Sequence, residues 1–154
     1  QPWVFVKNRS LMSDKGSMKR SAWKWLVEGG FAVITAKADQ QSLEEWTQKF
    51  SSPLIKATWS VLDSTSEISK SFFLLKSLPA CKGTYWYGLY INKRLAVVVS
   101  PYDVLAQISL SSNICEGVSS QMSKRSLVNT IMIALTTDYK NDQIHLPAIL
   151  KRIR

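Results

Sequence analysis

The polar residues most able to do chemistry gather near the end of the chain. The stretch 138–145, DYKNDQIH, holds the only histidine, His145, and two of the 11 acidic residues, Asp138 and Asp142. These three side chains are spaced i, i+4 and i+7, so on a helix they would share one face. Carboxylates together with an imidazole suit Zn²⁺ or Mn²⁺, and a metal held there could assist a hydrolysis.

A structural role explains the same residues without a metal. The stretch 138–145 lies between two helical patterns, so Asp138 and Asp142 can cap helix ends and fix the angle between the two helices. His145 would then hydrogen-bond a backbone carbonyl. The candidate cationic partners for the carboxylates, or supports for a polar site, are Arg94, Arg125 and Lys140. We expect this structural role for the polar turn, and we expect no metal or other cofactor.

A further acid, Asp103, follows the predicted strand 95–100. Open α/β sheets bind ligands beyond the carboxyl ends of their strands, so Asp103 is a candidate ligand residue. The alternative is an Asx turn or a helix N-cap. A metal-assisted hydrolase would require Asp103 to meet Asp138, Asp142 and His145 in one pocket, and this enzyme class remains an alternative.

The candidate nucleophiles do not fit a catalytic triad. Cys81 and Cys115 lie in loop-like stretches, and Ser100 ends a strand without flanking glycines. Pro101 follows Ser100 and removes a backbone N–H that an oxyanion hole would use. The two cysteines form no C-x-x-C motif, which disfavours a metal clip, but they can form one disulfide in an oxidising compartment.

The elements that must position these residues alternate along the chain. Strand patterns, which are runs rich in β-branched and aromatic residues, occur at 3–7, 31–36, 54–62, 85–91 and 95–100. Helical patterns start at Asp14 or Ser17, cover 39–50, start again at Ser123, and cover 146–153, where Pro147 suits a first turn. The apolar run 72–75 fits a strand or a helix, and 104–120 predicts a loop with one helical turn.

The order of these patterns predicts one α/β domain over residues 1–154. Strand, helix, Gly29-Gly30 and strand form a βαβ unit, which makes its two strands parallel. The short connection Asn92-Lys93-Arg94 predicts an antiparallel hairpin. The predicted fold is therefore a three-layer α/β domain with a mixed, mostly parallel sheet and a β-hairpin.

The charge of the chain is +9, from 20 basic and 11 acidic residues. Basic residues gather early, in the first helical pattern, where Lys15, Lys19 and Lys24 should face solvent opposite Met18, Ala22, Trp25 and Leu26. Such a surface favours anionic partners, either acidic lipid or acidic polymer. No zinc-finger spacing and no RNA-binding aromatic motif occurs, so no specific nucleic-acid binding is predicted.

Four segments carry a family resemblance: GGFAVITA (29–36), SFFLLKSLP (71–79), GLYINKRLAVVVSPYDVLA (88–106) and NTIMIALTTDYKNDQIHLPAILKRI (129–153). In this order they resemble the bacterial family called domain of unknown function 4159, over about residues 2–153. The resemblance implies a flavodoxin-like fold of the class I glutamine amidotransferase kind and a periplasmic or otherwise exported location. It assigns no reaction. The family domain usually has a further strand–helix portion upstream, so we expect this chain to be the C-terminal part of a longer or processed protein.

The sequence thus predicts a non-catalytic module of the bacterial cell envelope that binds a partner, most simply another envelope protein. The alternatives are the metal-assisted hydrolase and a module that binds anionic polymer or lipid through its basic N-terminal helix. No signal peptide and no apolar run long enough for a membrane span is found in the sequence. The sequence does not indicate an oligomeric state.

Overall fold

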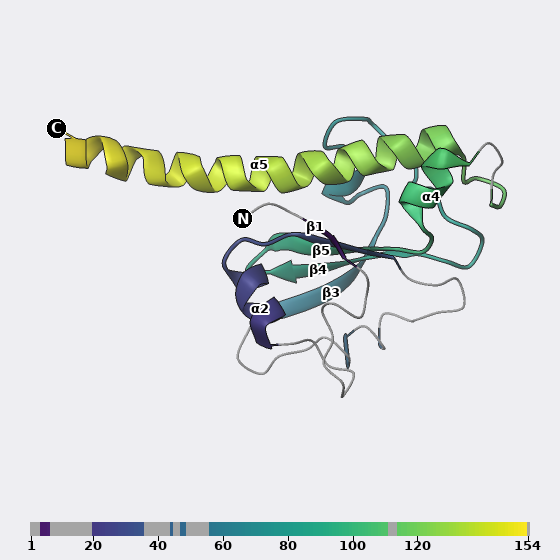
Figure 1. The fold of residues 1–154 in the computed structure, drawn as a ribbon, viewed down its shortest axis with the longest axis horizontal. Helices are drawn as coiled ribbons and strands as arrows, with labels where there is room; N and C mark the ends of the chain where they lie inside the picture. Colours follow the sequence, from purple (N-terminus) through teal and green to yellow (C-terminus); the bar gives the residue numbers. More distant parts are fainter. Residues whose placement is uncertain are drawn as a thin grey trace.

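The computed structural model describes the backbone of residues 4–6, 20–35, 44, 47–48, 56–110 and 114–153, and side chains for these ranges except 4–6 and 137–153. Within them the chain forms an α/β domain (Figure 1). Its elements in chain order are β1 (Val4–Val6), α2 (Arg20–Val27), β2 (Ala32–Thr35), β3 (Ala57–Leu62), the 3₁₀ turn η1 (Glu67–Ser69), β4 (Trp86–Ile91), β5 (Arg94–Ser100), α4 (Val104–Ser109) and α5 (Ser120–Ile153).

The sheet is mixed and open, with the strand order β1-β2-β5-β4-β3 among the described residues. β1 pairs with β2 in parallel, and β2 pairs with β5 in parallel. The β1-α2-β2 unit predicted from the glycine pair is therefore confirmed. β5 with β4 and β4 with β3 are antiparallel, so the parallel part is smaller than expected. β4 reaches β5 through a two-residue turn, which requires the antiparallel pairing predicted for this hairpin, whereas β3 is antiparallel to β4 across the long connection 63–85.

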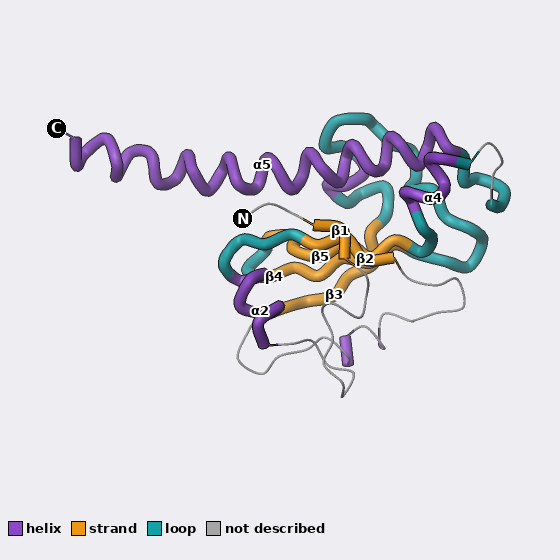
Figure 2. The backbone as a smooth tube through the Cα atoms, viewed as in Figure 1, coloured by secondary structure: helices purple, strands orange, loops and turns teal. Residues whose placement is uncertain are grey.

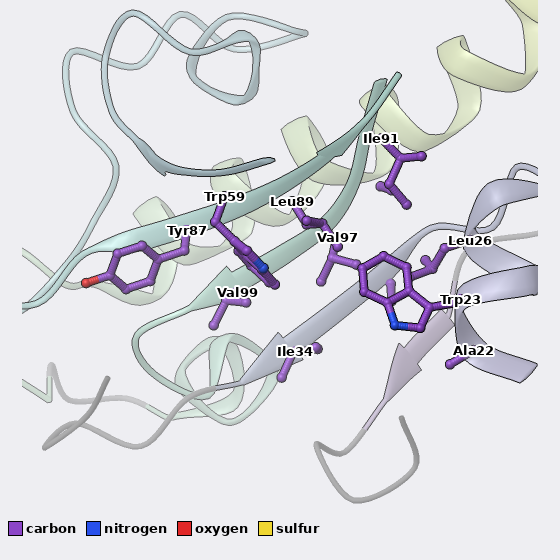
Figure 3. Close-up of a cluster of buried hydrophobic side chains, with 12 residues drawn as sticks. Ala22, Trp23, Leu26, Ile34, Trp59, Tyr87, Leu89, Ile91, Val97 and Val99 are labelled. Carbon is purple, nitrogen blue, oxygen red and sulfur yellow. The ribbon is translucent and has the colours of Figure 1, made fainter. Parts of the chain in front are cut away.

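Two apolar clusters hold helices against opposite faces of this sheet. On one face, α2 places Trp23 and Leu26 over Ile34, Trp59 and other side chains of β2 to β5, and all of these are buried (Figure 3). On the other face, Ile133 and Ala134 of α5 and Val104 of α4 pack on side chains of β2 to β5. Residues of β2 to β4 alternate between the two faces, as in strands covered on both sides, and β5 departs from this at the register shift, where Ala96 and Val97 belong to the same cluster.

Where it is described, the first helix has nearly the predicted phase. Ala22 and Leu26 are buried, whereas Lys24 is exposed. Trp23 is also buried, and Trp25 is only half-buried, so the buried stripe is shifted by part of a turn from the predicted one. The residues Lys15, Lys19 and Met18 lie outside the described part, as does most of the predicted helix 39–50, of which Glu44, Thr47 and Gln48 are helical.

The main difference from the sequence prediction is α5. One helix runs from Ser120 to Ile153, so the predicted polar turn 138–145 and the separate last helix are wrong. The segment contains no glycine, which is the residue that most readily ends a helix. Pro147 lies inside the helix rather than in a first turn, and it removes one backbone donor there. Figure 1 shows that the far half of α5 reaches beyond the sheet.

Two smaller predictions are also corrected. The run 72–75 is neither strand nor helix but part of the long connection between β3 and β4, which is drawn mostly as loop in Figure 2. Ser123 does not cap α5. The hydroxyl oxygen of Ser119 accepts the Met122 N–H (3.2 Å), and Ser123 is buried, with its hydroxyl 2.9 Å from that of Tyr102.

Candidate functional site

Asp103 lies directly after β5, at the edge where the parallel strands end. Its side chain accepts the backbone N–H of Ala106 at 3.0 Å and so caps α4. Behind it, the buried Ser100 donates its hydroxyl proton to the carbonyl of Tyr102. Of the two roles predicted for Asp103, the structure shows the helix N-cap.

The residues Asp138, Lys140, Asp142 and His145 all lie on the helical backbone of α5, and their side chains are outside the described part. Their distance from Asp103 follows from the backbone. The hydroxyls of Tyr102 and Ser123 are 2.9 Å apart, so the end of β5 lies beside the first turns of α5. Asp138 comes 15 residues after Ser123, which is about 22 Å along a helix. Asp103 therefore does not join that group in one pocket.

The remaining three residues stay a helical row with the spacing i, i+4, i+7. Among the residues whose side chains are described, no group of three or more His, Cys, Asp and Glu side chains could hold a metal ion. The absence of a metal-dependent effect remains a prediction for the row of Asp138, Asp142 and His145. Asp103 is not available to this row as a fourth ligand.

Arg94 joins the β4–β5 hairpin to the end of α2 by hydrogen bonds. Its guanidinium donates to the carbonyl of Gly30 at 3.0 Å and to the carbonyl of Leu26. Those carbonyls belong to the end of α2, where a cation is favoured by the helix dipole. Gly30 is required at this close approach, since an added Cβ would lie 2.4 Å from ring atoms of Trp25. Arg94 is thus a structural residue of the β2–β5 region.

Cys81 and Cys115 form a disulfide, with their Cα atoms 5.8 Å apart. The bond joins the connection before β4 to the segment before α5. Trp86 adds a second tie by donating its indole N–H to the carbonyl of Pro79 at 2.8 Å. Because both thiols are consumed, neither cysteine can act as a nucleophile.

A feature that the sequence prediction missed lies in the same connection. Asn129, fully buried in α5, holds the backbone of the loop 70–76. Its side-chain oxygen accepts the Phe73 N–H at 2.7 Å, and its amide donates to the carbonyls of Ile68 (2.8 Å) and Phe73 (2.9 Å). Ser71 donates its hydroxyl to the Asn129 carbonyl at 2.7 Å. The loop is therefore fixed on α5 although it has no regular structure.

This fixed loop presents apolar side chains to solvent. Phe72 is 62% exposed and Leu74 is 87% exposed, while Leu75 in the same loop is buried. The guanidinium carbon of Arg125 lies 5.5 Å from the ring centroid of Phe73, within cation–π range. The one signal in the sequence was that 72–75 has neither a strand nor a helix period. Nothing in the sequence identified Asn129 as its anchor.

The loop also has a basic residue at each end. Lys70 and Lys76 border it, and both are exposed. No acidic residue occurs anywhere between Glu67 and Asp103 in the sequence. The result is an apolar tip surrounded by positive charge. We call residues 70–76 the apolar loop.

No protein-family model matches the chain, and no curated protein matches it either. The resemblance described above therefore remains an expectation about fold and location. In the described part of the chain, no helix is both long enough and apolar enough to cross a membrane.

Proposed function

We propose that this chain is a non-catalytic binding module of the bacterial cell envelope, built on a three-layer, flavodoxin-like scaffold of the amidotransferase kind. We further propose that it docks on an acidic membrane surface through the apolar loop. The observation that carries the docking proposal is the exposure of Phe72 and Leu74 on a backbone held by Asn129.

The apolar tip suits a membrane better than water. Moving one large apolar side chain out of water contributes about 1.5–3 kcal/mol, and the two exposed tips can insert without any matching pocket. A stable protein–protein interface buries about 800 Å² per partner, which needs a much wider surface than two side chains. Anchoring by Asn129 means that little ordering entropy is lost on docking.

The charge around the tip selects the membrane type. Each lysine or arginine close to an anionic leaflet contributes about 1 kcal/mol. Lys70 and Lys76 border the apolar loop, Lys124 is exposed on the same end of α5, and Arg125 contacts Phe73. No acid in the stretch between Glu67 and Asp103 offsets them. An apolar tip within a basic border fits acidic lipid headgroups over an acyl layer.

The exported location has support of a different kind. Disulfides persist mainly in oxidising compartments such as the bacterial periplasm. The Cys81–Cys115 bond agrees with the exported location that the family resemblance implies. The non-catalytic part of the proposal rests on the loss of the cysteine nucleophiles and on the separation of Asp103 from the α5 row.

The test is binding to vesicles of defined composition. Wild-type protein should cosediment with phosphatidylglycerol–phosphatidylcholine vesicles and not with pure phosphatidylcholine vesicles, and added salt should weaken the binding. The double variant Phe72→Ser/Leu74→Ser should bind at least about tenfold more weakly, since two apolar insertions are lost. Val27→Ser removes an exposed apolar residue from α2, on the other side of the sheet, and should bind as wild type.

Equal loss in Phe72→Ser/Leu74→Ser and Val27→Ser would contradict docking through the apolar loop. Absence of binding to acidic vesicles would overturn the membrane proposal. In that case the same two side chains would be the contact surface for an envelope protein, the partner predicted from sequence alone.

A further inference from the structure

A second feature lies at the opposite end of the sheet from the apolar loop. A cavity of about 630 Å³ opens above the edge strand β3, its neighbour β4 and the hairpin turn. Pockets for small molecules typically have about 300–1,000 Å³. The described residues that line it are Lys56, Thr58, Ser60, Tyr90, Asn92 and Lys93.

Two small polar residues of β3, Thr58 and Ser60, line the cavity. Thr58 and Ser60 point to the face opposite the buried Trp59, and Ser60 pairs in register with Gly88 on β4. Small side chains therefore form the floor, and Tyr90 forms a wall.

The lining offers hydrogen-bond donors and positive charge. Lys56 and Lys93 supply ammonium groups, Asn92 an amide, and Thr58 and Ser60 hydroxyls. No acidic residue is among the described lining residues. Ammonium groups beside amide and hydroxyl donors suit phosphate or carboxylate oxygens together with the hydroxyls of a sugar-like ligand.

Tyr90 has a fixed position in this wall. Its hydroxyl donates to a carboxylate oxygen of Glu67 at 2.8 Å, which holds the ring in place. Burial, followed by the contact with Glu67, raises the pKa of Tyr90 well above its usual value, so the hydroxyl stays neutral at physiological pH. The Tyr90 hydroxyl itself therefore adds no charge to the cavity, and Glu67, which accepts its hydrogen bond, is not among the described lining residues.

The hairpin turn gives a second, independent argument. Asn92 and Lys93 have positive φ values of 50° and 66°. A two-residue turn of this kind favours Asn-Gly, and a non-glycine residue at the second position is strained. A lysine at 93 is thus unfavourable for the turn, but it brings an ammonium group to the rim of the cavity. Strained residues of this kind gather at ligand sites.

We infer that this cavity binds a small hydroxylated organic anion, such as a sugar phosphate or a sugar carboxylate, held by Lys56 and Lys93. The inference does not depend on the proposed membrane docking. The two sites lie at opposite ends of the sheet, one at the turn between β4 and β5 and the other after the end of β3.

The inference is tested with glucose 6-phosphate as the probe, inorganic phosphate as the bare anion and glucose as the uncharged control. Calorimetry on wild-type protein should detect saturable binding of glucose 6-phosphate, weaker binding of phosphate and none of glucose. Lys93→Gly should unfold at a higher temperature than wild type without probe, because glycine removes the turn strain. The same variant should bind glucose 6-phosphate at least about threefold more weakly, as expected for the loss of one exposed charge contact.

Lys24→Ala is the matched control, because it removes one exposed lysine from α2 on the other side of the sheet. It should bind glucose 6-phosphate as wild type. Equal affinity in Lys93→Gly and wild type would overturn the inference, as would binding of glucose as strong as that of its phosphate. Vesicle binding by Lys93→Gly should match that of Lys24→Ala. A selective loss of vesicle binding in Lys93→Gly would assign the cavity to a lipid headgroup instead of a soluble anion.

Discussion

Asn129 is the residue on which the presentation of the apolar loop depends. A buried asparagine is tolerated when its amide finds all its partners, and here one side chain satisfies three backbone groups of the segment 68–73. An aliphatic residue of similar size would leave those groups unpaired. The loop has no internal ladder to hold it, so this single side chain takes the place of regular structure.

Replacing Asn129 by alanine should therefore be costly. We expect Asn129→Ala to lower the free energy of unfolding by about 2–4 kcal/mol, because a buried group left without its partner costs about 1–3 kcal/mol. Urea denaturation measures this change. Thr136→Ala is the control from the same helix, since its exposed hydroxyl donates only to carbonyls of its own helix, those of Met132 and Ile133. That variant should not lose stability, because alanine is the better helix former by up to about 0.7 kcal/mol, and the absence of a loss in Asn129→Ala would show that the loop is not anchored this way.

At the scale of elements, α5 decides what the polar stretch near the C-terminus can do. In a continuous helix, Asp142 has no helix start to cap. Aspartate inside a helix is then only a weak helix former. The sign of the change in the free energy of unfolding on Asp142→Ala separates a continuous helix from a capped turn.

Asp142→Ala should raise the free energy of unfolding by up to about 0.7 kcal/mol, the difference in helix propensity between the two residues. If 138–145 were a capped turn, the same change would lower it by about 1 kcal/mol. Asp103→Ala provides the comparison, because Asp103 does cap α4 through the Ala106 N–H, and it should lose about 1 kcal/mol. Urea denaturation of both variants measures the two changes in the free energy of unfolding, which should have opposite signs.

The sequence was sufficient for the strands and for the parallel unit β1-α2-β2, because runs of β-branched and aromatic residues, Gly29-Gly30 and the short turn at Asn92 are local signals. It was misleading for α5, because the polar stretch 138–145 and Pro147 both favour a helix break, and the helix continues through them. The sequence narrowed Asp103 to two roles, either a ligand residue or a turn or helix N-cap. The cap is the role observed, because α4 begins at the next residue. The apolar loop could not be predicted, since its anchor Asn129 is more than 50 residues away in sequence.

At the scale of the whole molecule, the disulfide joins parts that the sheet does not. Cys81 and Cys115 are 34 residues apart, and the segment between them contains the β4–β5 hairpin and α4. The bond therefore limits how far the connection that carries the apolar loop can separate from the start of α5. Both ends of the tie lie beside the cluster beneath α5.

Removing the bond with Cys81→Ser/Cys115→Ser should lower the free energy of unfolding by about 4 kcal/mol, from the chain entropy of a loop of this length. Urea unfolding of wild-type and variant protein without reductant measures the difference. A thiol titration of unfolded, unreduced wild type provides the control and should find no free thiol. Two free thiols, or identical unfolding midpoints, would contradict a stabilising disulfide.

The same covalent ring determines what a single proteolytic cut would do. A cut after Lys82 or Lys93 opens the ring but leaves both pieces joined through Cys81 and Cys115, so they separate on a gel only after reduction. A cut after Lys70 or Lys76 lies outside the ring, so the two pieces separate on a denaturing gel without reduction. A single trypsin cleavage in the apolar loop thus leaves two pieces with no covalent link between them. Whatever covers that loop in the cell also protects the chain from being divided.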